Sequence, residues 1–267
     1  MDKFAGCINA LRTALPRFVL GGAVVATSLL LAGCGGGGGY EDPGISPHDA
    51  AAGFYNGRTA SGRSLSVIVL ETGRLYALYG PVGNPGSSVI EGVVAGDGSA
   101  IGSNFSSNGL IDANFANQTA TPVAISATFS LGTYFDANLA YLGGGSDSFK
   151  ADYSRVYELI PSVPGIAANY AGQLASAGGG VDDAVLSISP SGAVSLSTVG
   201  GCLGAGTIYT HPVGNVYDLT MTYGGGCPAP GRTLTGHASY DGVARSLVGI
   251  TPSPTLDRVL LFVGSRL

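Results

Sequence analysis

Apolar and polar side chains alternate with a period of two along several segments of this chain, and this alternation limits the fold most strongly. In Asn215–Tyr223 one face is formed by Tyr217, Leu219, Met221 and Tyr223. Arg232–Tyr240 alternates in the same way, with Leu234, Gly236, Ala238 and Tyr240 on one face. This pattern is typical of antiparallel strands that have water on one side. No segment after residue 50 has the period of an amphipathic helix, so the sequence predicts an all-β fold.

Short dipeptides that contain glycine separate the strand-like segments. Such residues tolerate the positive φ of tight turns, and they recur at the spacing of about 8–12 residues expected for a sandwich or barrel. The dipeptides are Thr72-Gly73, Asp97-Gly98, Asn108-Gly109, Ser191-Gly192 and Asp241-Gly242. We therefore expect an antiparallel meander that forms a barrel or a sandwich.

Two segments of the chain resemble each other. Residues 53–80 and 168–200 each begin with a tyrosine two residues before a glycine. Each continues with an Ala-Ser dipeptide, an apolar strand, a glycine turn and another strand. The corresponding pairs are Tyr55 with Tyr170, Gly57 with Gly172, and Gly73 with Gly192. The sequence therefore predicts that the fold consists of two similar halves.

The predicted halves are joined by Ile160–Gly165, which reads IPSVPG and has the composition of a linker. We expect a first β repeat at residues 51–159, a linker at 160–166 and a second β repeat at 167–267. The two halves could be separate domains or parts of one sheet system.

The N-terminal residues carry the features of an export signal. A basic segment of seventeen residues precedes an uncharged apolar run, Phe18–Leu31. This run is shorter than the ~20 residues that a membrane-spanning helix needs. The run leads into Leu31–Cys34, which reads LAGC and resembles the lipobox of bacterial lipoproteins. The alternative is a plain secreted protein with a chance cysteine.

The resemblance to bacterial lipoproteins implies a signal peptide at residues 1–33 that is cleaved before Cys34. It also implies that Cys34 carries diacylglycerol and an acylated amino group, so that the membrane is a partner through this lipid. Residues 34–50, which begin with Gly35–Gly39 after the cysteine, would form a flexible tether. Gly35, in place of aspartate, implies export to the outer membrane. Display on the periplasmic face and on the cell surface both remain open.

The pattern of each half resembles the small barrels of avidin-like proteins and the barrel domains of surface lipoproteins of the transferrin-binding-protein type. Both halves have a tyrosine–glycine start followed by a meander of hairpins. The resemblance implies a closed barrel, which removes exposed strand edges. Biotin binding in avidin-like proteins uses tryptophan, and this chain contains none. We therefore do not extend biotin binding to this chain.

Charge and cysteine content limit the partners of the mature chain. Removal of residues 1–33 leaves 9 of the 12 basic and 16 of the 17 acidic residues, a net charge of −7. A basic surface for nucleic acid is therefore excluded.

The cysteine count also changes in the mature chain. With Cys7 removed and Cys34 lipidated, Cys202 and Cys227 remain as a pair in an oxidising compartment.

The hairpin geometry predicts that Cys202 and Cys227 form a disulfide. Cys202 begins one strand-like run and Cys227 follows the next, with a turn near residues 211–214 that brings their far ends together. The loop closed by the bond would contribute about 3 kcal/mol. A free buried pair is the alternative. Zinc is disfavoured because no pair of histidines lies nearby in the sequence.

Residues with catalytic potential are scattered. His48, His211 and His237 are each expected to be solvated, and no nucleophile elbow or metal-ligand spacing occurs. The sequence thus predicts no catalytic residue, no metal site and no cofactor apart from the lipid on Cys34. Tyr153, Arg155 and Tyr157 would share one strand face and form a candidate binding surface. Ordinary packing of these side chains, with the arginine extended to solvent, is favoured over this binding role.

These observations favour a lipoprotein of the bacterial outer membrane that acts as a non-catalytic binding or envelope-structural module. Its ligand could be a protein or a small molecule. The alternative is a secreted hydrolase or carbohydrate-active β-domain tethered to the envelope, which would need an acid pair or a Ser/His/Asp set in one pocket. A membrane-spanning barrel is disfavoured because many strands are short and rich in serine.

Overall fold

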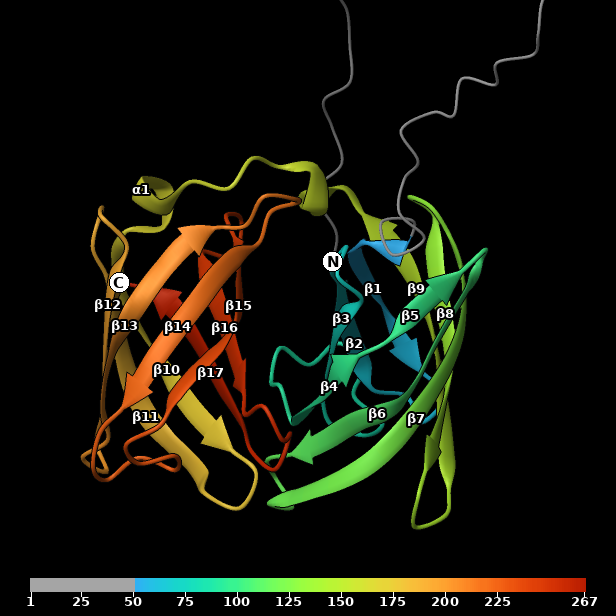
Figure 1. Ribbon diagram of the computed structural model, residues 1–267, viewed down its shortest axis with the longest axis horizontal. Helices are drawn as coiled ribbons and strands as arrows, with labels where there is room; N and C mark the ends of the chain where they lie inside the picture. The colour runs from blue at the N-terminus through green and yellow to red at the C-terminus, as the bar shows by residue number, and fades with distance from the viewer. Residues whose placement is uncertain (1–50) are drawn as a thin grey trace, which may run out of the picture. The chain divides into compact units, whose positions relative to one another are not determined.

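Residues 51–267 form two antiparallel β-barrels in a computed structural model of the chain (Figure 1). The prediction of an all-β meander in two similar halves is therefore confirmed. The predicted signal peptide, Cys34 and the tether lie outside the described residues. Between residues 51 and 267 no helix has the length and apolar character needed to cross a membrane.

The first barrel is a meander whose sheet closes on itself. Its first and last strands pair with each other, and β4 pairs with β6. The short β5 pairs with the opposite end of β6. The strands are β1 (Gly53–Thr59), β2 (Ser64–Val69), β3 (Arg74–Tyr79), β4 (Gly92–Asp97), β5 (Ser99–Ile101), β6 (Asn104–Asn114), β7 (Thr119–Ser130), β8 (Tyr134–Tyr141) and β9 (Ser146–Ser154).

The second barrel is a closed meander of eight strands, in which β10 pairs with β17. A 3-10 helix, η2 (Arg155–Glu158), and a one-turn helix, α1 (Val163–Ile166), connect the two barrels. The strands are β10 (Ala168–Ser176), β11 (Gly180–Ile188), β12 (Ala193–Thr198), β13 (Leu203–Thr210), β14 (Tyr217–Tyr223), β15 (Thr233–Asp241), β16 (Ser246–Pro252) and β17 (Val259–Arg266).

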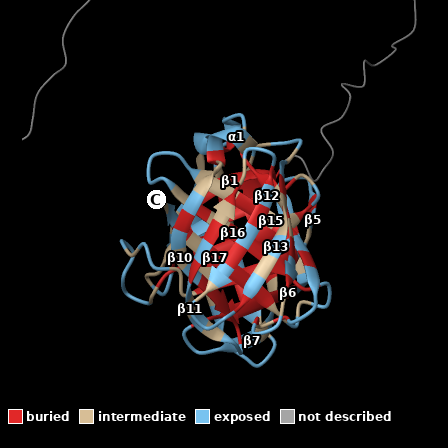
Figure 2. Cartoon of the chain, turned by 90° about the vertical axis from the view of Figure 1, so that its left-hand side faces the viewer, coloured by how far each residue is buried: buried red, intermediate tan, exposed pale blue. Residues whose placement is uncertain are grey.

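Each barrel is filled by the side chains that alternate inward along its strands. In β14 the four apolar and aromatic positions are buried and the intervening positions are more exposed, as predicted. The predicted faces of β15 are also confirmed, with Leu234, Gly236 and Ala238 buried. Figure 2 shows this alternation of burial on the strands of the second barrel.

The predicted duplication is visible in the contacts of its tyrosine pair. The hydroxyl of Tyr55 donates to the carbonyl oxygen of Ala51 at 2.9 Å. The hydroxyl of Tyr170 donates to the carbonyl oxygen of Ile166 at 2.7 Å, and this acceptor again lies four residues earlier in the chain. Both tyrosines are fully buried. The same residue thus fixes the entry into the first strand of each barrel.

The glycine pair marks the place where each barrel closes. A Cβ atom on Gly57 would lie 1.9 Å from the carbonyl oxygen of Lys150 in β9. A Cβ atom on Gly172 would lie 1.9 Å from the carbonyl oxygen of Val263 in β17. Because these strands are the last of their barrels, any side chain at either glycine would push the closing strand away.

The predicted turns are confirmed in part. Gly73 and Gly192 both have φ of 84° and occupy equivalent turns. Asn108 and Gly109, in contrast, lie inside β6, where the pairing with β7 shifts between Ser107 and Leu110. The prediction of a chain reversal there is wrong. The same conformational freedom accommodates a bulge within one long strand.

The two barrels pack against each other through apolar side chains on their outer faces. β3 is buried on both sides, since Leu75 and Ala77 point into the barrel while Tyr76 and Leu78 contact the interface. The interface cluster includes Phe54, Ile68, Leu70, Val93 and Ile111 from the first barrel and Val216, Ile250, Val259 and Leu261 from the second. Outer strand faces that alternation would assign to water are therefore covered.

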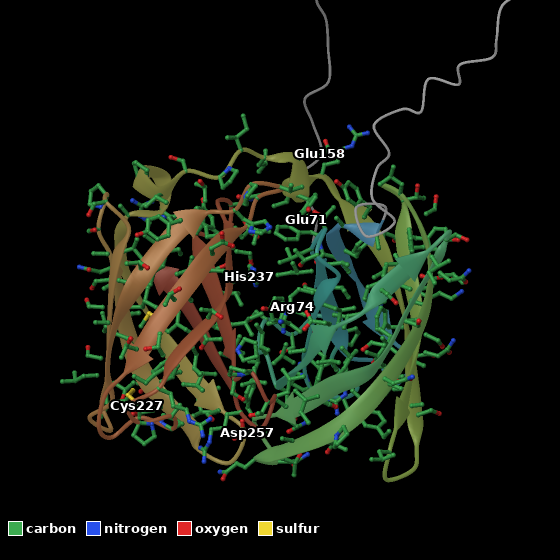
Figure 3. All side chains as sticks on the ribbon, viewed as in Figure 1. Glu71, Arg74, Glu158, Cys227, His237 and Asp257 are labelled. Carbon is green, nitrogen blue, oxygen red and sulfur yellow. A yellow bond between two sulfur atoms is a disulfide. The ribbon has the colours of Figure 1, made fainter. Side chains whose placement is uncertain are left out.

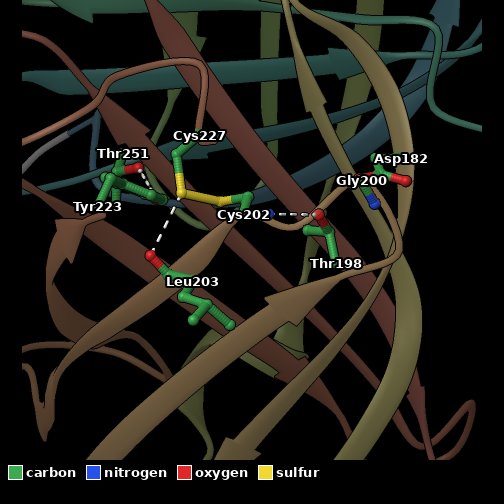
Figure 4. The surroundings of a disulfide bond; sticks show 8 residues. All are labelled: Asp182, Thr198, Gly200, Cys202, Leu203, Tyr223, Cys227 and Thr251. Atoms are coloured by element: carbon green, nitrogen blue, oxygen red, sulfur yellow. Dashed lines mark hydrogen bonds between the residues drawn. A yellow bond between two sulfur atoms is a disulfide. The ribbon is translucent and has the colours of Figure 1, made fainter. Parts of the chain in front are cut away.

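The predicted disulfide between Cys202 and Cys227 is confirmed (Figure 4). Their Cα atoms are 4.4 Å apart, at the ends of β13 and β14 that lie away from the connecting turn. The backbone nitrogen of Cys202 donates to Oγ1 of Thr198 at 3.1 Å, and both cysteines belong to the core of the second barrel.

We expect Gly57→Ala and Gly172→Ala each to lower the free energy of unfolding by about 3 kcal/mol or more, because the new methyl group meets a backbone carbonyl that cannot rotate away. Gly143→Ala is the matched control, since no atom lies within 4 Å of its added Cβ, and a change within about 0.5 kcal/mol is expected. Urea unfolding measures all three. If Gly57→Ala or Gly172→Ala were as stable as the wild type, the role assigned to that glycine would be contradicted.

Candidate functional site

A cavity with both polar and apolar lining residues opens at one end of the first barrel. It has a volume of about 460 Å³, within the range of small-ligand sites. Its walls come from the ends of β1, β3, β6 and β8 and the starts of β2, β4 and β9, so it is the mouth of the barrel. The lining residues include Thr59, Ser61, Arg63, Tyr79, Asp112, Asn114, Tyr141, Ser146 and Asp147.

A buried carboxylate lies at the centre of this mouth. Asp112 is on the inward face of β6, where apolar residues would continue the core, and it is 8% exposed. The hydroxyl of Tyr79 donates to its Oδ1 at 2.5 Å, and the hydroxyl of Tyr141 donates to its Oδ2 at 2.9 Å. The side-chain nitrogen of Asn114 donates to the Tyr79 hydroxyl at 3.3 Å.

A cation completes the group. The guanidinium carbon of Arg63 lies 4.9 Å from the centroid of the Tyr79 ring, a cation–π contact. Arg63 also pairs with Glu91 and donates to the carbonyl oxygen of Gly80 at 2.8 Å. Because Glu91 already neutralises this guanidinium, the carboxylate of Asp112 is stabilised mainly by the two tyrosine hydroxyls.

Burial controls the protonation of the mouth. It raises the pKa of Asp112, while the hydrogen bonds from Tyr79 and Tyr141 and the charge of Arg63 oppose the rise. Burial also raises the pKa of Tyr79 and of Tyr141, and the neighbouring Asp112 charge adds to both effects. The tyrosines therefore remain hydroxyl donors to the carboxylate.

The arrangement is suited to a ligand that offers hydrogen-bond donors. Each oxygen of Asp112 receives one tyrosine hydroxyl, and a carboxylate can accept about four hydrogen bonds in all. Asp147, a second acid of the lining, accepts a hydrogen bond from Ser61 at 2.7 Å. The mouth thus presents acceptors to a ligand.

At the corresponding end of the second barrel, buried side chains occupy the space that Asp112 and its partners take in the first. Successive strand pairings, starting from Tyr55 and Tyr170, place Asp112 at the position of Tyr223. The hydroxyl of Tyr223 bonds to Oγ1 of Thr251 at 2.7 Å. Cys202, Cys227 and Ala229 from the adjoining loops are packed into the core beside it. The two barrels therefore differ at this end: the first has a cavity that contains a buried acid, and in the second other side chains occupy the equivalent space.

The candidate binding surface predicted at Tyr153, Arg155 and Tyr157 does not form one strand face. β9 ends at Ser154, and Arg155 and Tyr157 lie in η2. Tyr157 is buried, and its ring contacts those of Phe54 and Tyr153. The strand prediction is wrong because alternation carries no signal for the 3-10 turn. The packing of Tyr157 agrees with the alternative that its role is structural.

Two of the three histidines are not solvated as predicted. The side chains of His211 and His237 are 8% and 20% exposed, because the first barrel covers this part of the second. Burial lowers the pKa of His237 to about 4. Their rings meet edge to face with centroids 5.5 Å apart. His48 lies outside the described residues.

Sequence patterns did not identify Arg63, Tyr79, Asp112 and Tyr141, because these residues are spread over four strand ends. One signal was present in the segment LIDAN, residues 110–114. Alternation from the inward Leu110 places both Asp112 and Asn114 inside the barrel, where polar residues need partners.

No family model matches the chain, and the comparison with curated proteins finds no similar sequence.

We expect Asp112→Asn to change how stability depends on pH. Since the pKa of Asp112 is raised on folding, the folded chain binds its proton more tightly than the unfolded chain does. The stabilising contribution of the Asp112 carboxyl group is therefore full below its pKa in the unfolded chain, about 3.9. This contribution is lost as pH rises through the pKa of the same group in the folded chain. The variant should gain stability relative to wild type between about pH 4 and about pH 7.

Chemical unfolding at both pH values measures this difference. Asp152→Asn is the matched control, because Asp152 is an exposed carboxylate on the outside of β9. A stability difference for Asp112→Asn that stays constant across this range would contradict the raised pKa.

Proposed function

We propose that this chain is a lipoprotein of the bacterial outer membrane that binds a small ligand at the mouth of its first barrel. The ligand offers hydrogen-bond donors, as an amine or amino sugar does. The protein acts as a non-catalytic binding module, and its anchor is the lipid on Cys34. The buried carboxylate of Asp112, held by two tyrosines in an open cavity, carries the binding part of the proposal.

The contrast between the barrels supports a binding role for the mouth. Packing the end of the second barrel with Tyr223 and the disulfide shows that the framework tolerates an apolar plug. The first barrel instead retains a buried acid, and burial of a charged group is costly for stability. Residues that cost stability are frequently kept for function.

The anchor is supported by the sequence alone. The basic segment, the apolar run and LAGC occur in the order required, although they lie outside the described residues. The apolar side chains of the strands point into the barrels, and this direction favours barrels that are surrounded by water. Interiors of both barrels are apolar, whereas a membrane-spanning barrel places its apolar band outside.

One observation favours the alternative of a tethered carbohydrate-active domain. Asp112 and Asp147 line the same cavity, and burial raises the pKa of Asp112. Glycosidases use two carboxyl groups, one of which has a raised pKa. Release of chromophore from aryl glycosides by wild type, with loss in Asp112→Asn, would favour this alternative over simple binding.

Binding is tested by calorimetric titration with glucosamine and with putrescine. We expect saturable binding of at least one probe by the wild-type chain. Affinity should fall about tenfold or more in Asp112→Asn, since a hydrogen bond to a charged group contributes about 1.5–3 kcal/mol. Asp152→Asn should bind as wild type does. Equal affinity in Asp112→Asn, or no binding of either probe, would contradict the proposed site and ligand class.

Anchoring is tested with Cys34→Ala. The variant should lose acyl labelling and membrane association, because the remaining chain has no attached lipid. Cys7→Ala is the matched control, since its cysteine lies in the predicted signal peptide and would be absent from the mature protein. Radiolabelled palmitate and membrane fractionation measure both outcomes. Continued labelling of Cys34→Ala would place the anchor elsewhere.

A further inference from the structure

A second cluster of polar side chains lies where the two barrels meet, and three of its members are far in the sequence from the residues of the mouth. His211 follows β13, Asp218 is on β14 and His237 is on β15. Asp218 and His237 are direct partners in the pairing of β14 with β15. Figure 3 labels His237 together with Glu71, which belongs to the turn between β2 and β3 of the first barrel.

The two imidazoles direct one nitrogen each toward the same carboxylate oxygen. Nδ1 of His211 lies 2.6 Å from Oδ1 of Asp218, and Nε2 of His237 lies 3.6 Å from that oxygen. The donor atoms of all three residues lie within 4.8 Å of one another. Three potential ligands from three successive segments thus converge on one point.

The other ring nitrogen of each histidine forms a hydrogen bond with a residue of the first barrel. Oε1 of Glu71 lies 2.8 Å from Nε2 of His211. The hydroxyl of Tyr76 lies 2.8 Å from Nδ1 of His237. Histidines that bind metal ions commonly bond their outer nitrogen to a carboxylate or another polar group, which fixes the ring for coordination. Both histidines here have this arrangement.

The charges of the cluster suit a dication. Asp218 and Glu71 supply two carboxylates, and Oε2 of Glu71 is buried without a hydrogen-bond partner among residues 51–267. Arg74 opposes them, but its guanidinium is paired with Asp97 at 2.9 Å. About half of the Asp218 side chain is exposed, so that water can reach the point of convergence and complete the coordination of a bound ion.

We propose that His211, Asp218 and His237 bind one Zn²⁺ ion, with Glu71 and Tyr76 orienting the two histidines and water as the fourth ligand. Two nitrogens and one carboxylate oxygen form a ligand set that zinc accepts. Ligands about 2.0–2.1 Å from a tetrahedral ion are about 3.3 Å apart. The 3.6 Å between His237 and Asp218 is near this value.

Binding exchanges a proton for the ion at His211. The 2.6 Å contact with Asp218 is a hydrogen bond, and its proton must leave to solvent before Nδ1 can coordinate. The contact then lengthens to the separation between two ligands. Because the ligands belong to the second barrel and the orienting residues to the first, zinc would connect the two barrels.

Zinc affinity is tested on the purified full-length chain after treatment with a chelator. Zn²⁺ is titrated in competition with a chromophoric chelator, and Co²⁺ absorption reports a tetrahedral site. We expect one Zn²⁺ per chain. His237→Ala should bind at least 100-fold more weakly. Glu71→Gln should bind 10–100-fold more weakly at unchanged stoichiometry, since Glu71 acts through His211.

His48→Ala is the matched control and should bind zinc as wild type does. If His237→Ala fails to fold by circular dichroism, Asp218→Asn decides, because its half-exposed side chain is replaced by one of equal size. Absence of saturable zinc binding to wild type would overturn the proposal and leave the cluster as a set of hydrogen bonds between the barrels. Undiminished affinity in the folded His237→Ala or Asp218→Asn variant would overturn it also.

Discussion

Each barrel depends on the contact between its first and last strands. In both, the backbone of the last strand approaches a glycine of the first so closely that no side chain fits between them. This contact joins segments nearly a whole repeat apart in the sequence, and it removes the exposed strand edges that an open sheet would have. The buried tyrosine two residues before the glycine bonds to the chain that enters the strand, so one short motif both starts and closes the barrel.

Once closure is fixed, the two ends of each barrel are free to differ. At one end of the second barrel the space is filled by Tyr223, by the disulfide and by the loop that carries Cys227. The equivalent space in the first barrel contains Asp112 and its two tyrosines. The shared framework supplies stability to both copies, and the copy with the polar mouth can accommodate a buried acid that the framework itself does not require.

Local features of the fold could be predicted from the sequence, because they depend on neighbouring residues. Alternation in β14 and β15, the turn glycines Gly73 and Gly192, and the disulfide at the ends of one hairpin all have this character. Asp112 and its tyrosines could not be assembled in the same way, since they meet only after the barrel has closed. The burial of His211 and His237 could not be predicted for a related reason: they follow the polar pattern of an outer face, but the other barrel covers that face.

The apolar cluster between the barrels has a consequence for modularity. A repeat that folds independently can be copied, moved or lost as a unit, whereas here each barrel carries an outer face of Phe, Ile, Leu and Val that only the other barrel covers. Separated, each would expose a contiguous apolar patch of the kind that promotes aggregation. The two barrels therefore depend on each other, because a chain that contained one barrel alone would expose its apolar outer face to water.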